Sequence, residues 1–170
     1  MNNRNDLKSQ GVRRILFICL GNICRSPAAD GIMHHLVEER GLSKEFYIDS
    51  AGIGSWHVGQ LPDRRMRQCG ARHGYVFDHR ARQFSPTDFD RFDLIVVMDE
   101  ENYRDVTRQM RSEADRKKVV RIRDYFRSHA GQQTVPDPYY GTDRDFDFAV
   151  ELLEDACAGL LDAVTGLDRR

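Results

Sequence analysis

Residues 13–27, which read RRILFICLGNICRSP, decide the fold. Residues 14–20 form a run of apolar side chains that is long enough for a buried strand and too short for a helix. The glycine-containing segment after it leads to Ser26 and Pro27, a helix cap followed by a proline suited to the first helical position. Apolar residues then recur at helical spacing, and Gly41 marks the expected end of the helix. The stretch therefore predicts a strand, a loop and a helix in succession.

The rest of the chain repeats this alternation. The last predicted helix carries one continuous apolar stripe, and Thr142 with Asp145 resembles a capping box at its start. Strands that alternate with helices predict a parallel sheet covered on both faces. We therefore expect an α/β fold with a four-stranded parallel sheet flanked by helices on both faces, a flavodoxin-like or Rossmann-like three-layer sandwich. The further elements expected are strands at 46–48, 93–98 and 119–122 and helices at 64–73, 100–110 and 146–164.

Length and composition limit the class of protein. A chain of 170 residues suggests an N-terminal extension at 1–12 and a single domain at 13–170. The net charge of −1 gives no bulk attraction to nucleic acid or to anionic lipid. The first eleven residues lack the apolar core of a signal peptide, and no apolar run is long enough to span a membrane. We expect a cytoplasmic protein, although secretion without a signal peptide stays open, and a monomer or weak self-association.

The cysteines are Cys19, Cys24, Cys69 and Cys157. A disulfide framework is a poor expectation for a chain of this size without an export signal. No CxxC pair occurs, and no Cys/His spacing fits the usual zinc patterns, so we expect no metal. We also expect no cofactor.

The loop at residues 19–26 carries the chemistry. It follows the carboxyl end of a strand, where ligands bind in open parallel sheets, and it enters a helix N-terminus, where free N–H groups favour an anion. Gly21 and Asn22 suit the tight or left-handed backbone of a cradling loop. Cys19 is the last residue on the strand side, and the guanidinium of Arg25 matches two phosphate oxygens. Helix dipoles and a cation favour a thiolate, so the loop predicts a nucleophile inside an oxyanion site.

Each of these residues has a plainer interpretation when taken alone. A lone cysteine at a strand end is usually buried in a core, and a lone arginine at a helix start is usually solvated. The pattern C-x5-R-S between a strand and a Ser-Pro helix start is more specific, and Ser26 can donate a hydrogen bond to the sulfur. An ATP-type phosphate loop is excluded because GxxxxGK[ST] is absent. The pattern indicates phosphate chemistry at a cysteine.

LFICLGNICRSP at 16–27 resembles the signature of the low-molecular-weight protein tyrosine phosphatase family. DSAGIGSWHVG at 49–59, VMDEENYRDV at 97–106 and VPDPYYG at 135–141 resemble later landmarks of that family in the same order. The resemblance covers roughly residues 13–165. It implies a four-stranded parallel sheet, phosphotyrosine-containing proteins as substrates, phosphate and vanadate as inhibitory anions, and no metal or cofactor.

The resemblance also implies the roles of the site residues. Cys19 is the nucleophile, Arg25 the phosphate clamp, and Asp137 the general acid and base, although an aspartate between two prolines is more often a turn residue. A tryptophan in such a loop often caps the edge of a core, but Trp56, the only tryptophan, is expected to form one wall of a slot for a substrate ring together with two tyrosines. The remaining set comprises the phosphate-binding loop Leu20, Gly21, Asn22, Ile23, Cys24 and Ser26, the supporting residues Ser50, His79 and Asp99, and the rim residues Trp56, Tyr139 and Tyr140.

Several alternatives stay open. Family members often form a reversible disulfide between residues placed like Cys19 and Cys24, so the resemblance implies one here. The alternative is that Cys24 only packs beneath the loop. The rival functions are a protein arginine phosphatase, an arsenate reductase of the same fold and a non-catalytic phosphate-binding module. Ile23 stands where arginine phosphatases tend to carry threonine. Residues 70–156 contain no cysteine for an arsenate reductase relay, and Cys69 alone does not supply one. Phosphotyrosine hydrolysis is therefore favoured.

Overall fold

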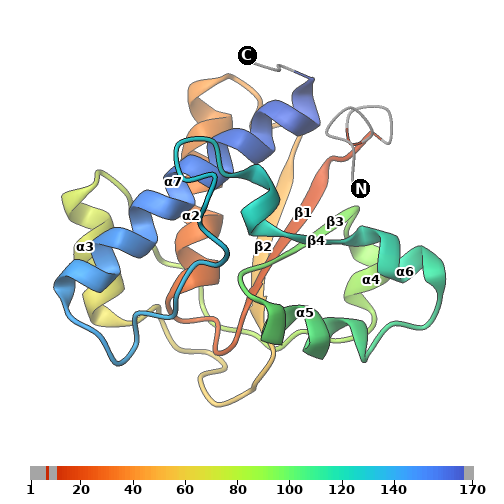
Figure 1. Cartoon of the computed structure of the whole chain (residues 1–170), viewed down its shortest axis with the longest axis horizontal. Coiled ribbons are helices and arrows are strands. Elements are labelled where there is room, and N and C mark those ends of the chain that lie inside the picture. Colours follow the sequence, from red (N-terminus) through yellow and green to blue (C-terminus); the bar gives the residue numbers. More distant parts are fainter. Residues whose placement is uncertain (1–6, 8–10, 167–170) are drawn as a thin grey trace.

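The strand, loop and helix expected from residues 13–27 are present as β1 (Arg14–Cys19) and α2 (Arg25–Glu39). The computed structural model describes residue 7 and residues 11–166 (Figure 1), so most of the expected extension at 1–12 lies outside the described residues. The other strands are β2 (Tyr47–Gly52), β3 (Leu94–Val97) and β4 (Val119–Arg121). The other helices are α3 (Arg64–Arg72), α4 (Asp88–Arg91), α5 (Glu100–Thr107), α6 (Glu113–Lys118), the 3-10 helix η1 (Ile122–Tyr125) and α7 (Asp143–Thr165).

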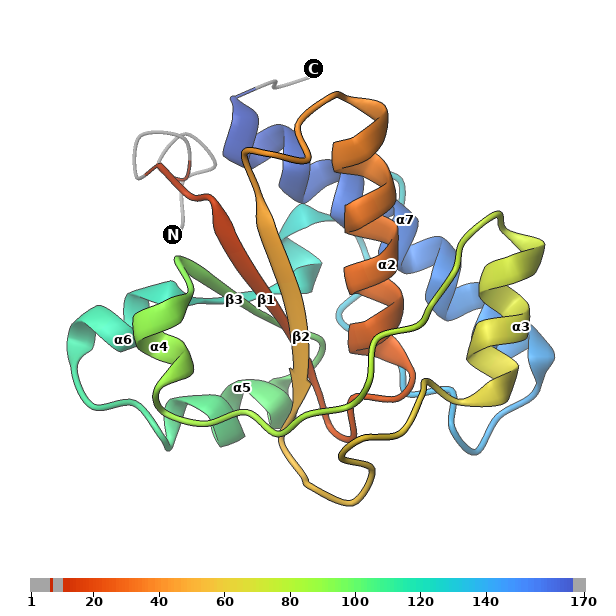
Figure 2. The ribbon, with the colours of Figure 1, turned by 180° about the vertical axis from the view of Figure 1, so that it is seen from behind.

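The four strands form one parallel sheet in the order β2-β1-β3-β4. Helices α2, α3 and α7 lie on one side of this sheet and α4, α5 and α6 on the other (Figures 1 and 2). The predicted α/β sandwich is confirmed. Because β1 is paired on both edges, its carboxyl end opens at the centre of the sheet, between the connections that leave its two neighbours.

The side chains of β1 alternate between two apolar cores, as the two-residue period of a strand requires. Ile15, Phe17 and Cys19 belong to the core beneath α2 and α7. Leu16 and Ile18 face the opposite core. That second core is closed mainly by the aromatic and aliphatic residues Phe84, Phe89, Phe92, Ile95, Val97 and Val106. The alternation places Cys19, the last residue of β1, on the side of α2.

Helix α2 begins two residues earlier than predicted. Cys24 occupies the N-cap and Arg25 is the first helical residue, so the expectation that Ser26 caps the helix was wrong. Pro27 is still tolerated because the first N–H groups of a helix have no intrahelical acceptor. The early start turns the hydroxyl of Ser26 toward β1 instead of the helix end. The predicted stop is confirmed, since Gly41 follows the helix with a left-handed φ of 68°.

Helix α7 packs against α2 and, nearer its own start, against α3 (Figure 2). At its start the backbone N–H of Thr142 donates to Asp145 Oδ2 at 2.7 Å, the arrangement that the capping-box pattern predicts. Its apolar stripe is completely buried, including Phe146, Val150 and Leu153. No helix within the described part of the chain is long and apolar enough to cross a membrane.

The stripe on α7 gives a stability test. Leu153 is fully buried, whereas Glu151, on the same helix, is exposed. We expect Leu153→Ala to lower the free energy of unfolding by about 2–5 kcal/mol, because it loses buried apolar contacts and leaves a cavity. The control Glu151→Ala should stay within about 0.5 kcal/mol of the parent chain. Urea denaturation measures both, and equal midpoints for the two variants would show that α7 does not carry the core.

Candidate active site

A pocket of about 280 Å³ opens at the carboxyl end of β1. This is the position at which open parallel sheets bind ligands. Three segments form it: the loop that joins β1 to α2, the loop after β2, and the segment before α7. The lining residues are Cys19, Leu20, Gly21, Ile23, Cys24, Arg25, Trp56, His57, Asp137, Tyr139 and Tyr140.

The sulfur of Cys19 lies at the inner end of this pocket and is held by a serine. Cys19 Sγ is 3.0 Å from Ser26 Oγ. The same Ser26 oxygen accepts a hydrogen bond from Asn22 Nδ2 at 2.7 Å, which leaves its own hydrogen free to be donated. The other acceptor in reach, the carbonyl oxygen of Ala51, is farther away at 3.5 Å. A hydroxyl donor placed in this way stabilises a sulfur that carries negative charge.

Asn22 fixes the shape of the loop. Its φ of 58° makes it the only non-glycine residue with a positive φ among the described residues. Its buried side chain donates to Ser26 and to Ser50 Oγ at 3.0 Å, and its Oδ1 accepts from the backbone N–H of Arg82 at 3.0 Å. The left-handed turn was expected at Gly21 or Asn22, and it falls on Asn22. Gly21 instead makes room, because a Cβ there would lie 3.2 Å from the ring of His57.

Arg25 is almost completely buried, with 3% of its side chain exposed. Its Nη1 donates to Asp99 Oδ2 at 2.7 Å and to the carbonyl oxygen of Val135 at 3.0 Å. Burial alone would lower the pKa of Arg25, but the nearby Cys19 sulfur and the Asp99 carboxylate hold that pKa above its ordinary value. One edge of the guanidinium is therefore anchored while the group stays charged.

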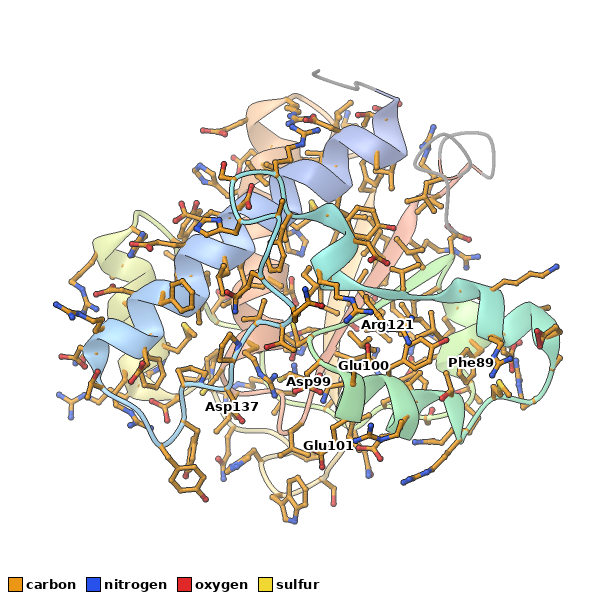
Figure 3. All side chains as sticks on the ribbon, in the orientation of Figure 1. Phe89, Asp99, Glu100, Glu101, Arg121 and Asp137 are labelled. Atoms are coloured by element: carbon orange, nitrogen blue, oxygen red, sulfur yellow. The ribbon has the colours of Figure 1, made fainter. Side chains whose placement is uncertain are left out.

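Asp137 stands on the pocket wall opposite the loop. Its Oδ2 is 3.6 Å from Arg25 Nη2, and its Oδ1 accepts from the backbone N–H of Tyr139 at 3.1 Å. The side chain is 41% exposed, so it faces both the pocket and solvent. Figure 3 shows Asp137 and Asp99 at the same end of the sheet, on two different connections. The pocket thus brings a thiol, a guanidinium and a carboxylate together.

A family model described as low molecular weight phosphotyrosine protein phosphatase matches residues 14–169. The chain belongs to this family. A Synechocystis protein whose name places it in the same family is 49% identical over 148 residues, covering 87% of this chain and 94% of that protein. The crystal structure of a protein tyrosine phosphatase from Entamoeba histolytica, with Hepes in its active site, is 39% identical with a TM-score of 0.85. The matched region covers 88% of this chain and 94% of the Entamoeba chain.

The crystal structure of a Drosophila arginine phosphatase is also similar, at 32% identity and a TM-score of 0.80. It covers 87% of this chain and 95% of its own. The resemblance, the sandwich fold and the hydrolase class expected from the sequence are confirmed by these matches. The matched region includes the pocket and all three of its segments.

Two of the expected supporting residues of this phosphatase lie behind the loop and do not line the pocket. Ser50 accepts from Asn22 and donates to Asp30 Oδ2 at 3.1 Å. His79 Nδ1 lies 3.5 Å from both Asp30 Oδ2 and Asp49 Oδ1, so it reaches the loop only through these carboxylates. Sequence reasoning missed the buried Asp30. The available signal was a carboxylate one helical turn after the serine of the loop.

Aromatic side chains line the phosphatase pocket. Trp56 is exposed, Tyr140 is 97% exposed, and the rings of Tyr139 and Tyr140 meet edge to face with centroids 4.9 Å apart. Sequence reasoning missed His57, which lines the pocket beside Trp56. It also missed Arg65, whose Nη2 donates to the carbonyl oxygen of Tyr139 at 2.9 Å and so ties α3 to the segment before α7. A histidine inside a loop and an arginine on a polar helix gave no sequence signal.

Cys24 differs from Cys19 although both belong to one loop. Burial, and then the neighbouring Cys19 sulfur, raises the pKa of the Cys24 thiol well above its ordinary value, so this thiol keeps its proton at neutral pH. Both cysteines are free thiols in this structure. The reversible disulfide that the family resemblance implies stays a prediction.

The bonds of Asn22 can be separated from its backbone conformation. Asn22→Gly loses the side-chain hydrogen bonds but accepts a positive φ, whereas Asn22→Ala loses the bonds and is strained. We expect both variants to lose about 1–3 kcal/mol for each partner left buried without a hydrogen bond. Asn22→Ala should be the less stable of the two by about 1 kcal/mol. Urea denaturation decides, and an alanine variant as stable as the glycine variant would contradict the assignment.

Proposed function

We propose that this chain hydrolyses phosphotyrosine in proteins through a phosphocysteine intermediate, with Cys19 as nucleophile, Arg25 as phosphate clamp and Asp137 as general acid and base. One observation carries the proposal. A single pocket contains the Cys19 sulfur, the buried guanidinium of Arg25 and the carboxylate of Asp137, each held by separate hydrogen bonds. The names of the similar proteins support the same reaction.

The first step transfers the phosphoryl group to sulfur. The Cys19 thiolate forms a bond to phosphorus as the bond from phosphorus to the phenolic oxygen breaks. Arg25 and the N–H groups at the start of α2 bind the non-bridging oxygens, whose charge they stabilise in place of a metal ion. Asp137 gives its proton to the departing oxygen. Tyrosine has an ordinary pKa of about 10, and a positioned acid contributes about 10²–10⁴-fold to such a departure.

The second step returns the enzyme to its starting state. Asp137, now ionised, takes a proton from a water molecule that attacks phosphorus. The bond between phosphorus and sulfur breaks, inorganic phosphate leaves and the Cys19 thiolate is restored. The hydroxyl of Ser26, 3.0 Å from the sulfur, favours this departure because it stabilises the thiolate. Phosphate and vanadate should occupy the same loop as inhibitory anions.

The pocket lining favours an aryl phosphate. Ile23 presents an apolar side chain, and Trp56, Tyr139 and Tyr140 supply aromatic surface at the mouth. A phosphoarginine side chain would bring a polar guanidinium group against Ile23. An arsenate reductase relay has no support, because Cys69 and Cys157 are fully buried on α3 and α7 and neither lines the pocket. A module that only binds phosphate would not need a proton donor such as Asp137 in its pocket.

One chain supplies the complete pocket, so we infer that the enzyme acts as a monomer or with weak self-association. Its partners are phosphotyrosine-containing proteins that present the modified side chain at the mouth. The four free thiols suit a reducing compartment such as the cytoplasm.

Turnover of p-nitrophenyl phosphate and of tyrosine phosphates tests the assigned roles. Cys19→Ser should abolish activity because a serine hydroxyl in this site is not ionised. Asp137→Asn should lower kcat with tyrosine phosphates by about 10²–10⁴-fold, since it removes the proton donor. Cys157→Ala, at a buried thiol remote from the pocket, is the matched control and should retain activity. Turnover by Cys19→Ser at the rate of the parent chain would refute the mechanism.

Peptides that carry either phosphotyrosine or phosphoarginine test the substrate class. We expect kcat/KM to favour phosphotyrosine by about 10-fold or more, the range that one apolar contact can give. Ile23→Thr should narrow this ratio because it replaces an apolar wall by a hydroxyl. A parent chain that prefers phosphoarginine would identify the arginine phosphatase alternative instead.

A further inference from the structure

A second cluster of reactive side chains lies between α3 and α7, outside the phosphatase pocket. Cys69 and His73 are four residues apart, at the end of α3, and so face the same side. Both point at one atom of α7, Asp147 Oδ1. The Cys69 Sγ is 3.1 Å from this oxygen, and His73 Nε2 is 3.2 Å from it. The three ligand-type atoms all lie within 4.8 Å of one another.

We propose that Cys69, His73 and Asp147 form a zinc site that clips α3 to α7. Thiolate, imidazole and carboxylate are the donors that Zn²⁺ takes in proteins. Zinc bonds of about 2.0–2.3 Å in a tetrahedron place neighbouring donors about 3.3–3.5 Å apart. The spacings to Asp147 are only a few tenths of an ångström shorter than this, so small side-chain rotations admit the ion. Water would complete the tetrahedron from the partly exposed side of Asp147.

The surroundings of His73 fit a metal ligand. Its second ring nitrogen, Nδ1, lies 3.3 Å from Glu154 Oε1. The other oxygen of Glu154 accepts from the hydroxyl of Tyr75 at 2.7 Å, which holds this carboxylate in place. A carboxylate on the far nitrogen keeps the hydrogen on Nδ1, so that the lone pair of Nε2 points at the ion. Carboxylate–histidine–zinc arrangements of this kind orient ligands in known zinc sites.

Two groups would change state when the ion binds. Arg72 Nη2 is 3.1 Å from Asp147 Oδ1, and its side chain is 49% exposed, so it can withdraw to solvent. Zinc binding forms the bond to the Cys69 sulfur and releases the proton of that thiol to water.

Local Cys/His spacings in the sequence predicted no metal. Cys69 and His73 form only half of a site, and Asp147 lies 78 residues beyond Cys69. The resulting clip has a structural consequence. The loop that contains Trp56 leads into α3, and the segment that contains Asp137 leads into α7, so the ion would fix the two helices that carry opposite walls of the pocket.

Metal binding to the Cys19→Ser chain tests the site without a second thiolate in the phosphatase pocket. Titration with Co²⁺ should give a single site per chain, with a sulfur-to-cobalt charge-transfer band that Zn²⁺ abolishes. In the same background, Cys69→Ala should remove the band, and His73→Ala should weaken zinc at least about 10-fold. Cys157→Ala, which removes an equally buried thiol, should leave the cobalt band and the zinc affinity unchanged.

Asp147→Asn is the second variant, for use if the cysteine variant does not fold, because asparagine keeps the shape of the side chain. It should also weaken zinc binding at least about 10-fold. At the same zinc concentration, the melting temperature should rise more for the Cys19→Ser chain than for its Asp147→Asn derivative. A cobalt–sulfur band that is absent, or that survives Cys69→Ala, would overturn the site. None of these measurements uses turnover, so the outcome is independent of the phosphatase mechanism.

Discussion

The hydrogen bonds of the Asn22 side chain are the constraint on which the phosphatase pocket depends. One buried amide joins three separate parts of the chain: Ser26 on α2, Ser50 on β2 and the backbone of Arg82 before α4. These bonds hold residue 22 in a left-handed conformation that a non-glycine residue adopts only at a cost. Such a turn lets consecutive peptide N–H groups face a common anion. The geometry of the loop is therefore set by contacts on the side of the loop that faces the protein interior.

The charges of the pocket are arranged around a single buried cation. A guanidinium with 3% exposure is costly to desolvate, and the bond from Arg25 to Asp99 offsets that cost while it fixes the orientation of the group. The other terminal nitrogen, Nη2, lies 3.6 Å from Asp137 Oδ2, and the nearby Cys19 sulfur helps to keep the guanidinium charged. Asp99 also caps α5, because its carboxylate accepts a hydrogen bond from the backbone N–H of Asn102 at 2.7 Å. The start of α5 therefore fixes the carboxylate that binds Arg25. Two hydrogen bonds thus connect the position of the Arg25 guanidinium to the start of α5.

Features encoded locally could be predicted from the sequence. The apolar run of β1, the stripe of α7 and the Cys19-to-Ser26 loop each lie within one segment, and the structure has them where expected. The start of α2 was misplaced because the Ser26 hydroxyl is claimed by a tertiary contact that propensity does not see. Helix α6 has little apolar periodicity, so no pattern indicated it. Arg65 could not be assigned, since its partner Tyr139 is 74 residues away.

Side-chain contacts of α3 connect the two walls of the pocket mouth. Arg65 at the start of α3 bonds to Asp63 and to Tyr139, and so ties the wall after β2 to the wall before α7. One turn farther along α3, the cluster around Asp147 makes a second tie between the same two helices. The two contacts thus join α3 to the same neighbouring segment at two points, four residues apart on α3. Helix α7 is itself packed against α2 through its buried face. The contacts between α3 and α7 therefore connect both pocket walls to the helix that carries Arg25.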